Sequence, residues 1–408
     1  MAPLASAQYS GRLVGYSQIP GSKSGAIHAQ DILKRCPPAF SLCRGVLSSP
    51  LTIKLPIGGS AWDSRSGLLW ACDDMFLAAY SIKTCSQKCR FKSFTMDSKA
   101  VPSGLAIAEH KRQLWMLETR PGYLGLRPWS LNGCKAVPTR GGCSFRLPNK
   151  SMVSGGLAYD EGRDLLYYTV SEPQPLNWVH TLFVAKAGFG SACRPICKYP
   201  LKHCSLVKRA ITGLTFDPWT QQLFATDGQN TRTLRVVDPL KCRFVDLGCC
   251  KKGMPQQDWL GLAWQPAFAM TRFGKGCSKK PCANCPSPLH GMGPGSPSIG
   301  NTDFTLTLRS GPTGSYGIFL LSPGSCTKGL AVPFLCTAIY PATSPAPLVL
   351  NIGALQGYSS CDGALDLRLP LPPDSKLCGA KLCSQWLMLC AGPGFAVSNA
   401  LQWQITGG

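Results

Sequence analysis

GSAWD at residues 59–63 returns in closely related form at four later positions, which are GLAIA at 104–108, GLAYD at 156–160, GLTFD at 213–217 and GLAWQ at 261–265. In each copy a glycine is followed by alternating small, apolar and polar positions and then by a polar turn. The first four copies lead into a second apolar run, namely 68–71, 113–116, 166–169 and 223–226. This alternation is typical of short antiparallel strands.

The leading glycines are 45 to 57 residues apart. Repeats of roughly 40–50 residues that each hold several short strands are typical of β-propeller blades. A single four-stranded sheet cannot cover both of its faces, so such sheets stack around an axis. The innermost strand needs a small residue where the sheets crowd together. The sequence therefore predicts an all-β fold with a five-bladed β-propeller over residues 25–275.

The fifth repeat is incomplete, because a Pro/Gly/Lys-rich stretch follows residues 267–270. The N-terminal region offers the missing outer hairpin, with an apolar run and a cysteine on each side of Pro37-Pro38. We therefore predict that the N-terminal segment closes the last blade, so that no raw sheet edge remains. Residues 1–24 are expected to form a separate leader or arm.

The chain has 22 cysteines, a number that favours an oxidising compartment and hence secretion. Several occur in close pairs in phase with the repeats, near the turn of each outer hairpin. We predict that these cysteines form disulfides that staple the outer strands, while their connectivity stays open. The candidates are Cys36, Cys43, Cys85, Cys89, Cys134, Cys143, Cys242 and Cys249.

Residues 276–299 are rich in Pro, Gly and Cys, which predicts a linker without regular structure. Beyond it, residues 300–408 contain six or more short alternating runs separated by Gly/Pro turns. This pattern predicts a C-terminal Ig-like β-sandwich.

This C-terminal part resembles the sandwich of a large class of secreted bacterial proteins. The resemblance rests on Asn301–Phe304, on Ser384-Gln-Trp386 and on the ending Gly394–Leu401, which matches a recurrent "QW…GFxxSNAL" pattern. In that class the ending often follows a propeller of the NHL or lactonase-like type. The resemblance implies secretion and a two-domain layout, and it implies no settled activity. It extends from about residue 57 to residue 408, and the high cysteine and lysine content departs from the usual pattern.

The formal net charge is +22, from 42 Lys and Arg against 20 Asp and Glu. A field of this sign attracts polyanions, so acidic polysaccharides or a cell surface are expected partners. Nucleic acid is a less favoured partner, since the basic residues are scattered and no nucleic-acid-binding motif is present. No stretch of 18 apolar residues occurs, so no membrane span is predicted.

Three acidic residues, Asp73, Glu118 and Asp227, each lie 14 residues beyond the glycine of their repeat. A ring of such carboxylates would suit Ca²⁺, which prefers oxygen ligands, and lactonase-like propellers use a metal to polarise an ester. The alternative is that each carboxylate caps a tight turn, as in Asp227-Gly228. The turn-cap interpretation is favoured, because no histidine or second carboxylate offers itself as a hydrolytic base.

Three further patterns carry chemical hypotheses. Cys277, Cys282 and Cys285, with His290, have a zinc-like spacing, and the favoured alternative is a disulfide-stapled linker. Asn149-Lys-Ser151 is a glycosylation sequon. Trp129, Trp178 and Trp219 stand in turn-like contexts and are candidates for exposed carbohydrate stacking, whereas the other tryptophans alternate with polar residues as in a core.

No nucleophile elbow, phosphate loop or metalloprotease motif is present, and the sequence favours a role other than catalysis. We expect a secreted structural or interaction protein that assembles into an oligomer or fibre through its N-terminal arm and its sandwich. The alternatives are a metal-dependent lactonase-like hydrolase and a monomeric binder of acidic glycans.

Overall fold

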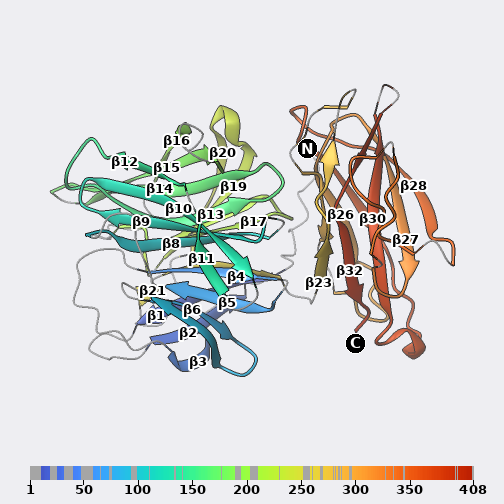
Figure 1. The fold of residues 1–408 in the computed structure, drawn as a ribbon, viewed down its shortest axis with the longest axis horizontal. Helices are drawn as coiled ribbons and strands as arrows, with labels where there is room; N and C mark the ends of the chain where they lie inside the picture. The colour runs from blue at the N-terminus through green and yellow to red at the C-terminus, as the bar shows by residue number, and fades with distance from the viewer. Residues whose placement is uncertain are drawn as a thin grey trace.

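The computed structural model describes most of the chain in an all-β fold (Figure 1). The described residues are 11–18, 25–31, 40–46, 58–64, 66–72, 76–92, 99–109, 111–132, 135–139, 141–175, 177–188, 194–202, 210–228, 230–250, 258–259, 261–266, 270–278, 280, 282–283, 285, 287–293, 296–326, 328–333, 335–342, 345–390, 392 and 394–406. Within these ranges the helical elements are two short 3₁₀ turns, η2 (Pro239–Lys241) and η3 (Ser375–Leu377). No helix in the described part of the chain is long and apolar enough to span a membrane.

The first four glycine-led repeats each form one antiparallel sheet. The first sheet contains β4 (Gly59–Asp63), β5 (Leu68–Cys72), β6 (Phe76–Ser81) and β7 (Ser86–Lys92). The second contains β8 (Val101–Ala108), β9 (Gln113–Arg120), β10 (Tyr123–Asn132), β11 (Lys135–Pro138) and β12 (Cys143–Arg146). The third contains β13 (Val153–Asp160), β14 (Leu165–Pro173), β15 (Trp178–Lys186) and β16 (Pro195–Leu201), and the fourth contains β17 (Gly213–Asp217), β18 (Gln222–Thr226), β19 (Thr231–Asp238) and β20 (Arg243–Cys250).

A further sheet combines the two ends of this region. It contains β1 (Gly11–Gln18), β2 (Gly25–Asp31), β3 (Phe40–Val46), β21 (Asp258–Trp259) and β22 (Ala263–Pro266). Strand β1 pairs with both β2 and β22, so the N-terminal strands complete the sheet that the fifth glycine repeat begins. The expected leader of residues 1–24 therefore needs correction, because β1 lies inside it and belongs to the sheet.

The innermost strands β4, β8, β13, β17 and β22 contact one another in this order, and β22 also contacts β4. The sheets therefore surround a common axis, and the arrangement is a β-propeller. The crowding explains the repeated glycine. A Cβ atom on Gly261 would lie 2.5 Å from the backbone nitrogen of Ser60, and one on Gly59 would lie 2.6 Å from that of Leu105. The space between neighbouring sheets is filled by buried apolar side chains such as Trp70, Trp115 and Tyr168.

The remaining strands form two sheets that share one hydrophobic core, beside the propeller in Figure 1. The larger sheet contains β23 (Met270–Phe273), β24 (Cys277–Ser278), β27 (Tyr316–Pro323), β28 (Leu348–Ala354), β30 (Lys381–Leu389), β31 (Phe395–Val397) and β32 (Ala400–Gln404). The smaller sheet contains β25 (Leu289–Met292), β26 (Thr305–Gly311) and β29 (Gly363–Arg368). Side chains of both sheets, such as Leu306, Phe319 and Trp386, meet in the core.

The expected linker at residues 276–299 is corrected by this pairing. Strand β24 pairs with β31 and β25 pairs with β26, so this Pro/Gly-rich segment belongs to the C-terminal sheets. Even β23, which was expected inside the propeller, pairs with β32. The short strands were hidden because Pro and Gly separate them and each contributes few residues.

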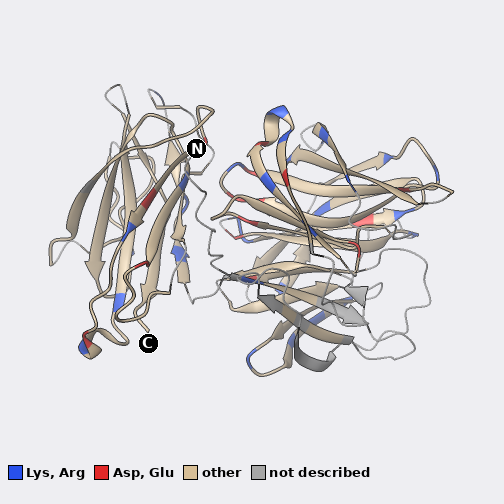
Figure 2. Cartoon of the chain, turned by 180° about the vertical axis from the view of Figure 1, so that it is seen from behind, with Lys and Arg blue, Asp and Glu red and all other residues tan. Residues whose placement is uncertain are grey.

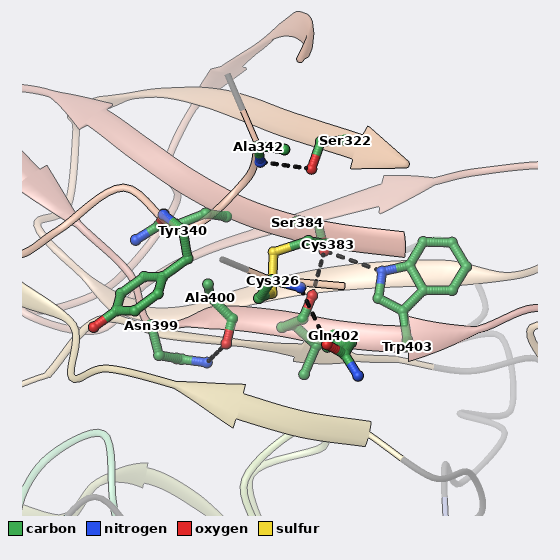
Figure 3. The surroundings of a disulfide bond; sticks show 12 residues. Ser322, Cys326, Tyr340, Ala342, Cys383, Ser384, Asn399, Ala400, Gln402 and Trp403 are labelled. Atoms are coloured by element: carbon green, nitrogen blue, oxygen red, sulfur yellow. Dashed lines mark hydrogen bonds between the residues drawn. A yellow bond between two sulfur atoms is a disulfide. The ribbon is translucent and has the colours of Figure 1, made fainter. Parts of the chain in front are cut away.

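Five disulfide bonds join pairs of described cysteines, namely Cys197–Cys242, Cys277–Cys336, Cys282–Cys390, Cys285–Cys361 and Cys326–Cys383. Four of them lie in the C-terminal part and fasten segments far apart in sequence. Figure 3 shows Cys326–Cys383, which ties the segment after β27 to the central strand β30. The backbone nitrogen of Cys326 also donates to Gln402 Oε1 at 3.1 Å, and both interactions hold this segment beside β32.

The cysteines that lie in close pairs along the repeats do not all bond within one hairpin. Cys242 bonds to Cys197 on the neighbouring sheet and not to Cys249, because strand β20 carries the chain about 20 Å away between the two positions. Cys85 and Cys89 are both disulfide-bonded. Cys143 and Cys249 are also disulfide-bonded. Cys36 and Cys134 lie outside the described residues, as does the side chain of Cys43.

Candidate functional site

The propeller and the C-terminal sheets meet at a buried cluster of charged residues. Glu109 and Glu161 directly follow the inner strands β8 and β13, so the repeat places both at the same end of the sheets. Arg272 on β23 reaches them from the C-terminal part. Its Nη1 lies 2.6 Å from Glu161 Oε2 and 3.4 Å from Glu109 Oε2. One arginine thus joins two sheets of the propeller to the neighbouring domain.

Burial determines the electrostatics of this cluster. The side chain of Arg272 is 13% exposed, and its Nε is buried without a hydrogen-bond partner among the described residues. Burial raises the pKa of Glu109, the positive charge of Arg272 opposes this rise, and the neighbouring Glu161 adds to it. The cavities on the two sides of the cluster have volumes of about 90 and 290 Å³. The arrangement is suited to holding the domains together.

Trp219 strengthens the same junction. Its ring centroid lies 4.9 Å from the guanidinium carbon of Arg272, which is a cation–π distance. A Cβ atom on Gly291 of β25 would lie 1.9 Å from the indole, so this glycine lets the ring pack against the strand backbone. Arg309 Nε donates to the Trp219 carbonyl oxygen at 3.1 Å. Trp219 is therefore a contact between domains.

Asp217 fixes the turn that presents Trp219. Its Oδ1 accepts from the Trp219 backbone nitrogen at 2.9 Å, and its Oδ2 accepts from Thr220 Oγ1 at 2.5 Å. Burial raises the pKa of Asp217 to about 6, although these hydrogen bonds lower it.

Two of the three tryptophans proposed for sugar stacking are buried, so the prediction is wrong for them. Trp129 is 1% exposed and packs between sheets, and Trp219 is 3% exposed at the domain junction. The turn-like sequence around each tryptophan does not indicate that residues distant in the sequence cover its ring. Trp178, at the start of β15, is partly exposed, and its stacking role stays a prediction.

The carboxylates proposed for a metal site do not form a binding cluster within the described residues. Asp73 lies outside them. Glu118 is buried in β9 opposite Pro102, at the far end of the sheet from Glu109. Asp227 Oδ1 accepts from the backbone nitrogen of Asn230 at 2.7 Å, as a turn cap does. No group of three metal-ligating side chains was found in the described part of the chain, so Ca²⁺ binding stays a prediction without geometric support.

The zinc-like spacing is explained by disulfides, since Cys277, Cys282 and Cys285 are all bonded to later cysteines. His290 is buried in the C-terminal core, where its Nε2 lies 2.8 Å from Ser384 Oγ. Burial lowers the pKa of His290 to about 3, so the ring is neutral. The zinc hypothesis is therefore wrong for these residues.

Asn149 is exposed in a turn, as glycosylation requires. Its Oδ1 accepts from Ser151 Oγ at 2.9 Å, and its Nδ2 donates to Glu172 Oε1 at 2.7 Å. Modification of the sequon stays a prediction.

The charge distribution is diffuse. Figure 2 shows Lys and Arg scattered over the turns and strands of both domains. This scatter agrees with the absence of basic clusters from the sequence.

A groove of about 680 Å³ lies beside the junction. One wall comes from the fourth propeller sheet, with Gln222 of β18 and Arg235 of β19. The other comes from β26, β29 and the segment that contains Tyr358. This groove could not be predicted from the sequence, because its walls come from two separate parts of the chain.

The residues of the junction could be predicted only in part. Glu109 and Glu161 occupy the same position of two repeats, five residues after Gly104 and Gly156. The matching positions of these two glutamates in the repeat could therefore have pointed to the junction from the sequence alone. Arg272 follows a run with no distinguishing pattern.

No family model matches the chain, and no curated protein matches it either. Among solved structures, it is similar to the β-propeller domain of Cps50 (Swd1) from Myceliophteria thermophila, with 9% identity and a TM-score of 0.31 over 97% of this chain and 98% of that chain. It is also similar to the WD40 domain of SCAP from fission yeast, with 10% identity and a TM-score of 0.28 over 97% of this chain and 85% of that chain. At these TM-scores neither likeness carries an inference about this chain, so the description of the fold rests on its own strand pairing.

Proposed function

We propose that this chain is a secreted structural or interaction protein that assembles with copies of itself. In this proposal it consists of a five-bladed β-propeller and a C-terminal β-sandwich, and it resembles the secreted bacterial propeller proteins with the "QW…GFxxSNAL" ending. The disulfides support secretion, because such bonds persist in oxidising compartments.

The observation that carries self-assembly is the edge strand β28. Among the described residues it pairs with β27 alone, so its other edge has no partner strand. Its sequence, LVLNIGA, contains neither a charge nor a proline. Leu348 and Val349 are 54% and 53% exposed. Monomeric proteins usually protect such an edge with charges, prolines or a covering segment.

An added strand from a second copy would pair with this edge and cover its apolar side chains. In this proposal the N-terminal arm supplies that strand, and residues 1–10, the part of the arm that precedes β1, lie outside the described residues. A contact between the arm of one copy and the sheet of the next is head-to-tail, so repetition builds a fibre, or a closed oligomer where the rotation between copies closes a ring.

The test is negative-stain imaging and light scattering of the purified, oxidised protein. We expect fibres or large oligomers from the full chain, and their loss on deletion of residues 1–10 or in Val349→Lys. Val179→Lys is the matched control, because Val179 is 45% exposed on β15, which is paired on both sides. A discrete monomer at high concentration, or assembly unchanged in Val349→Lys, would overturn the proposal.

A further inference from the structure

The groove between the propeller and the C-terminal sheets has the size and place of a ligand site. Its volume of about 680 Å³ lies within the roughly 300–1,000 Å³ of small-molecule sites, which often occur between domains. The walls are built mainly on strands β18, β19, β26 and β29. Such walls hold their side chains in fixed positions.

The groove carries an exposed aromatic ring. Tyr358 is 89% exposed, although its backbone nitrogen is fixed by a hydrogen bond of 2.9 Å to Asp362 Oδ2. Asp362 also accepts from the backbone nitrogen of Ser359 at 2.7 Å. The ring is therefore held out from an ordered turn, where one face can stack on the apolar face of a sugar.

The opposite wall offers a cation and an acceptor. Arg235 and Gln222 are direct partners across β18 and β19, so their side chains share one face of the sheet. The Arg235 side chain has no ion pair or hydrogen bond to any described residue. Gln222 is 3% exposed, and its Oε1 has no hydrogen-bond donor in the described structure.

The other charges of the groove are already engaged. Arg309 bonds to Asp366 at 2.5 Å, and Arg163 bonds to Asp160 at 2.9 Å. Arg235 is therefore the cation of this wall that is available to a ligand carboxylate. Arginine commonly binds carboxylates in a bidentate geometry with two parallel hydrogen bonds. The unsatisfied Gln222 acceptor calls for a hydroxyl donor.

We propose that this groove binds an oligosaccharide containing a uronic acid, with Tyr358 stacked on a sugar ring, Arg235 paired with the uronate carboxylate and Gln222 accepting a sugar hydroxyl. The net charge of +22 raises the local concentration of such an anionic chain. The site does not depend on self-assembly, because β28 and residues 1–10 are not part of its walls.

The test is isothermal titration calorimetry at low salt with tetragalacturonic acid, and with neutral maltotetraose as the comparison sugar. We expect the acidic sugar to bind and Tyr358→Ala and Arg235→Gln each to weaken it by about tenfold. Tyr316→Ala and Arg243→Gln are matched controls, because Tyr316 is 42% exposed and neither residue lines the groove, and both should leave the affinity unchanged. Truncation at Tyr358 should spare the fold, since the ring is almost fully exposed.

Four results would overturn the proposal. They are no binding of either sugar, equal binding of maltotetraose, full affinity in Tyr358→Ala, and a loss confined to Tyr316→Ala. Binding of the acidic sugar by the variant that lacks residues 1–10 would support the groove even where assembly fails.

Discussion

Arg272 Nη1 lies 2.6 Å from Glu161 Oε2, and this contact joins a strand of the C-terminal sheets to the turn after β13 of the propeller. Both side chains are largely buried, at 13% and 10% exposed. The junction therefore depends on the buried positive charge of Arg272, which the carboxylates of Glu161 and Glu109 compensate.

Arg272→Met should lower the free energy of unfolding by about 3–5 kcal/mol, because Glu161 and Glu109 would stay buried without their cation. Arg368→Met is the control, since Arg368 and its partner Asp303 are 66% and 68% exposed and such a pair contributes less than about 1 kcal/mol. Calorimetry and urea unfolding measure both. Adding Glu161→Gln to Arg272→Met should recover part of the loss, and equal losses in the two arginine variants would contradict the role of the cluster.

Asp217→Asn should flatten the dependence of stability on pH. Burial raises the pKa of Asp217 from 3.8 to about 6, so the folded state holds this proton more tightly than the unfolded chain does. The resulting stabilisation is complete below pH 3.8 and is lost as the pH rises through about 6. Between pH 4 and 7 the wild type should lose about 2 kcal/mol more than the variant does. Urea unfolding at both pH values measures this, and identical losses would refute the assignment.

Gly261→Ala should destabilise the propeller by about 3 kcal/mol, because the new methyl group would meet backbone atoms of Gly59 and Ser60 at 2.5–2.8 Å. Gly248→Ala is the control, because it introduces backbone strain without a steric clash. Gly248 has a φ of 100°, and a Cβ there meets nothing within 4 Å, so its replacement should cost about 1–2 kcal/mol. Equal thermal stability of the two variants would argue against tight packing of the inner strands.

Cys378 should react with iodoacetamide in the native, unreduced protein, because its side chain is exposed and forms no disulfide. Cys282 and Cys390 should stay unlabelled until reductant is added, since they are bonded to each other. Peptide mapping by mass spectrometry measures each site. Labelling of Cys282 without reductant would show that this disulfide does not form.

The glycine-led repeat allowed the propeller to be predicted from the sequence. Strands β4 and β17 begin at Gly59 and Gly213, and the apolar run at 68–71 lies within β5. Glycine is required there by contact between neighbouring backbones, and that requirement recurs in every sheet. The same regularity placed Asp63 and Asp217 at turns, where both accept hydrogen bonds from following residues.

The junction was harder to predict from the sequence, because the residues that meet there come from distant parts of the chain. Trp219 follows Asp217-Pro218, a sequence that indicates an exposed turn, and nothing local indicates that β25 will cover the ring. The linker prediction failed for a related reason. Cys277 and Cys282 stand among prolines and lysines, and their disulfides to Cys336 and Cys390 secure a segment with little strand-forming tendency.

The sheet that contains both β1 and β22 also constrains how the chain matures. Arg12 Nε donates to Gln265 Oε1 at 2.7 Å across a sequence separation of 253 residues. Strand β1 pairs with β2, which lies close to it in the sequence, whereas its pairing with β22 needs the distant fifth glycine repeat. Pairing over such a sequence distance is slow, so the sheet that β1 and β22 share should be completed late in folding.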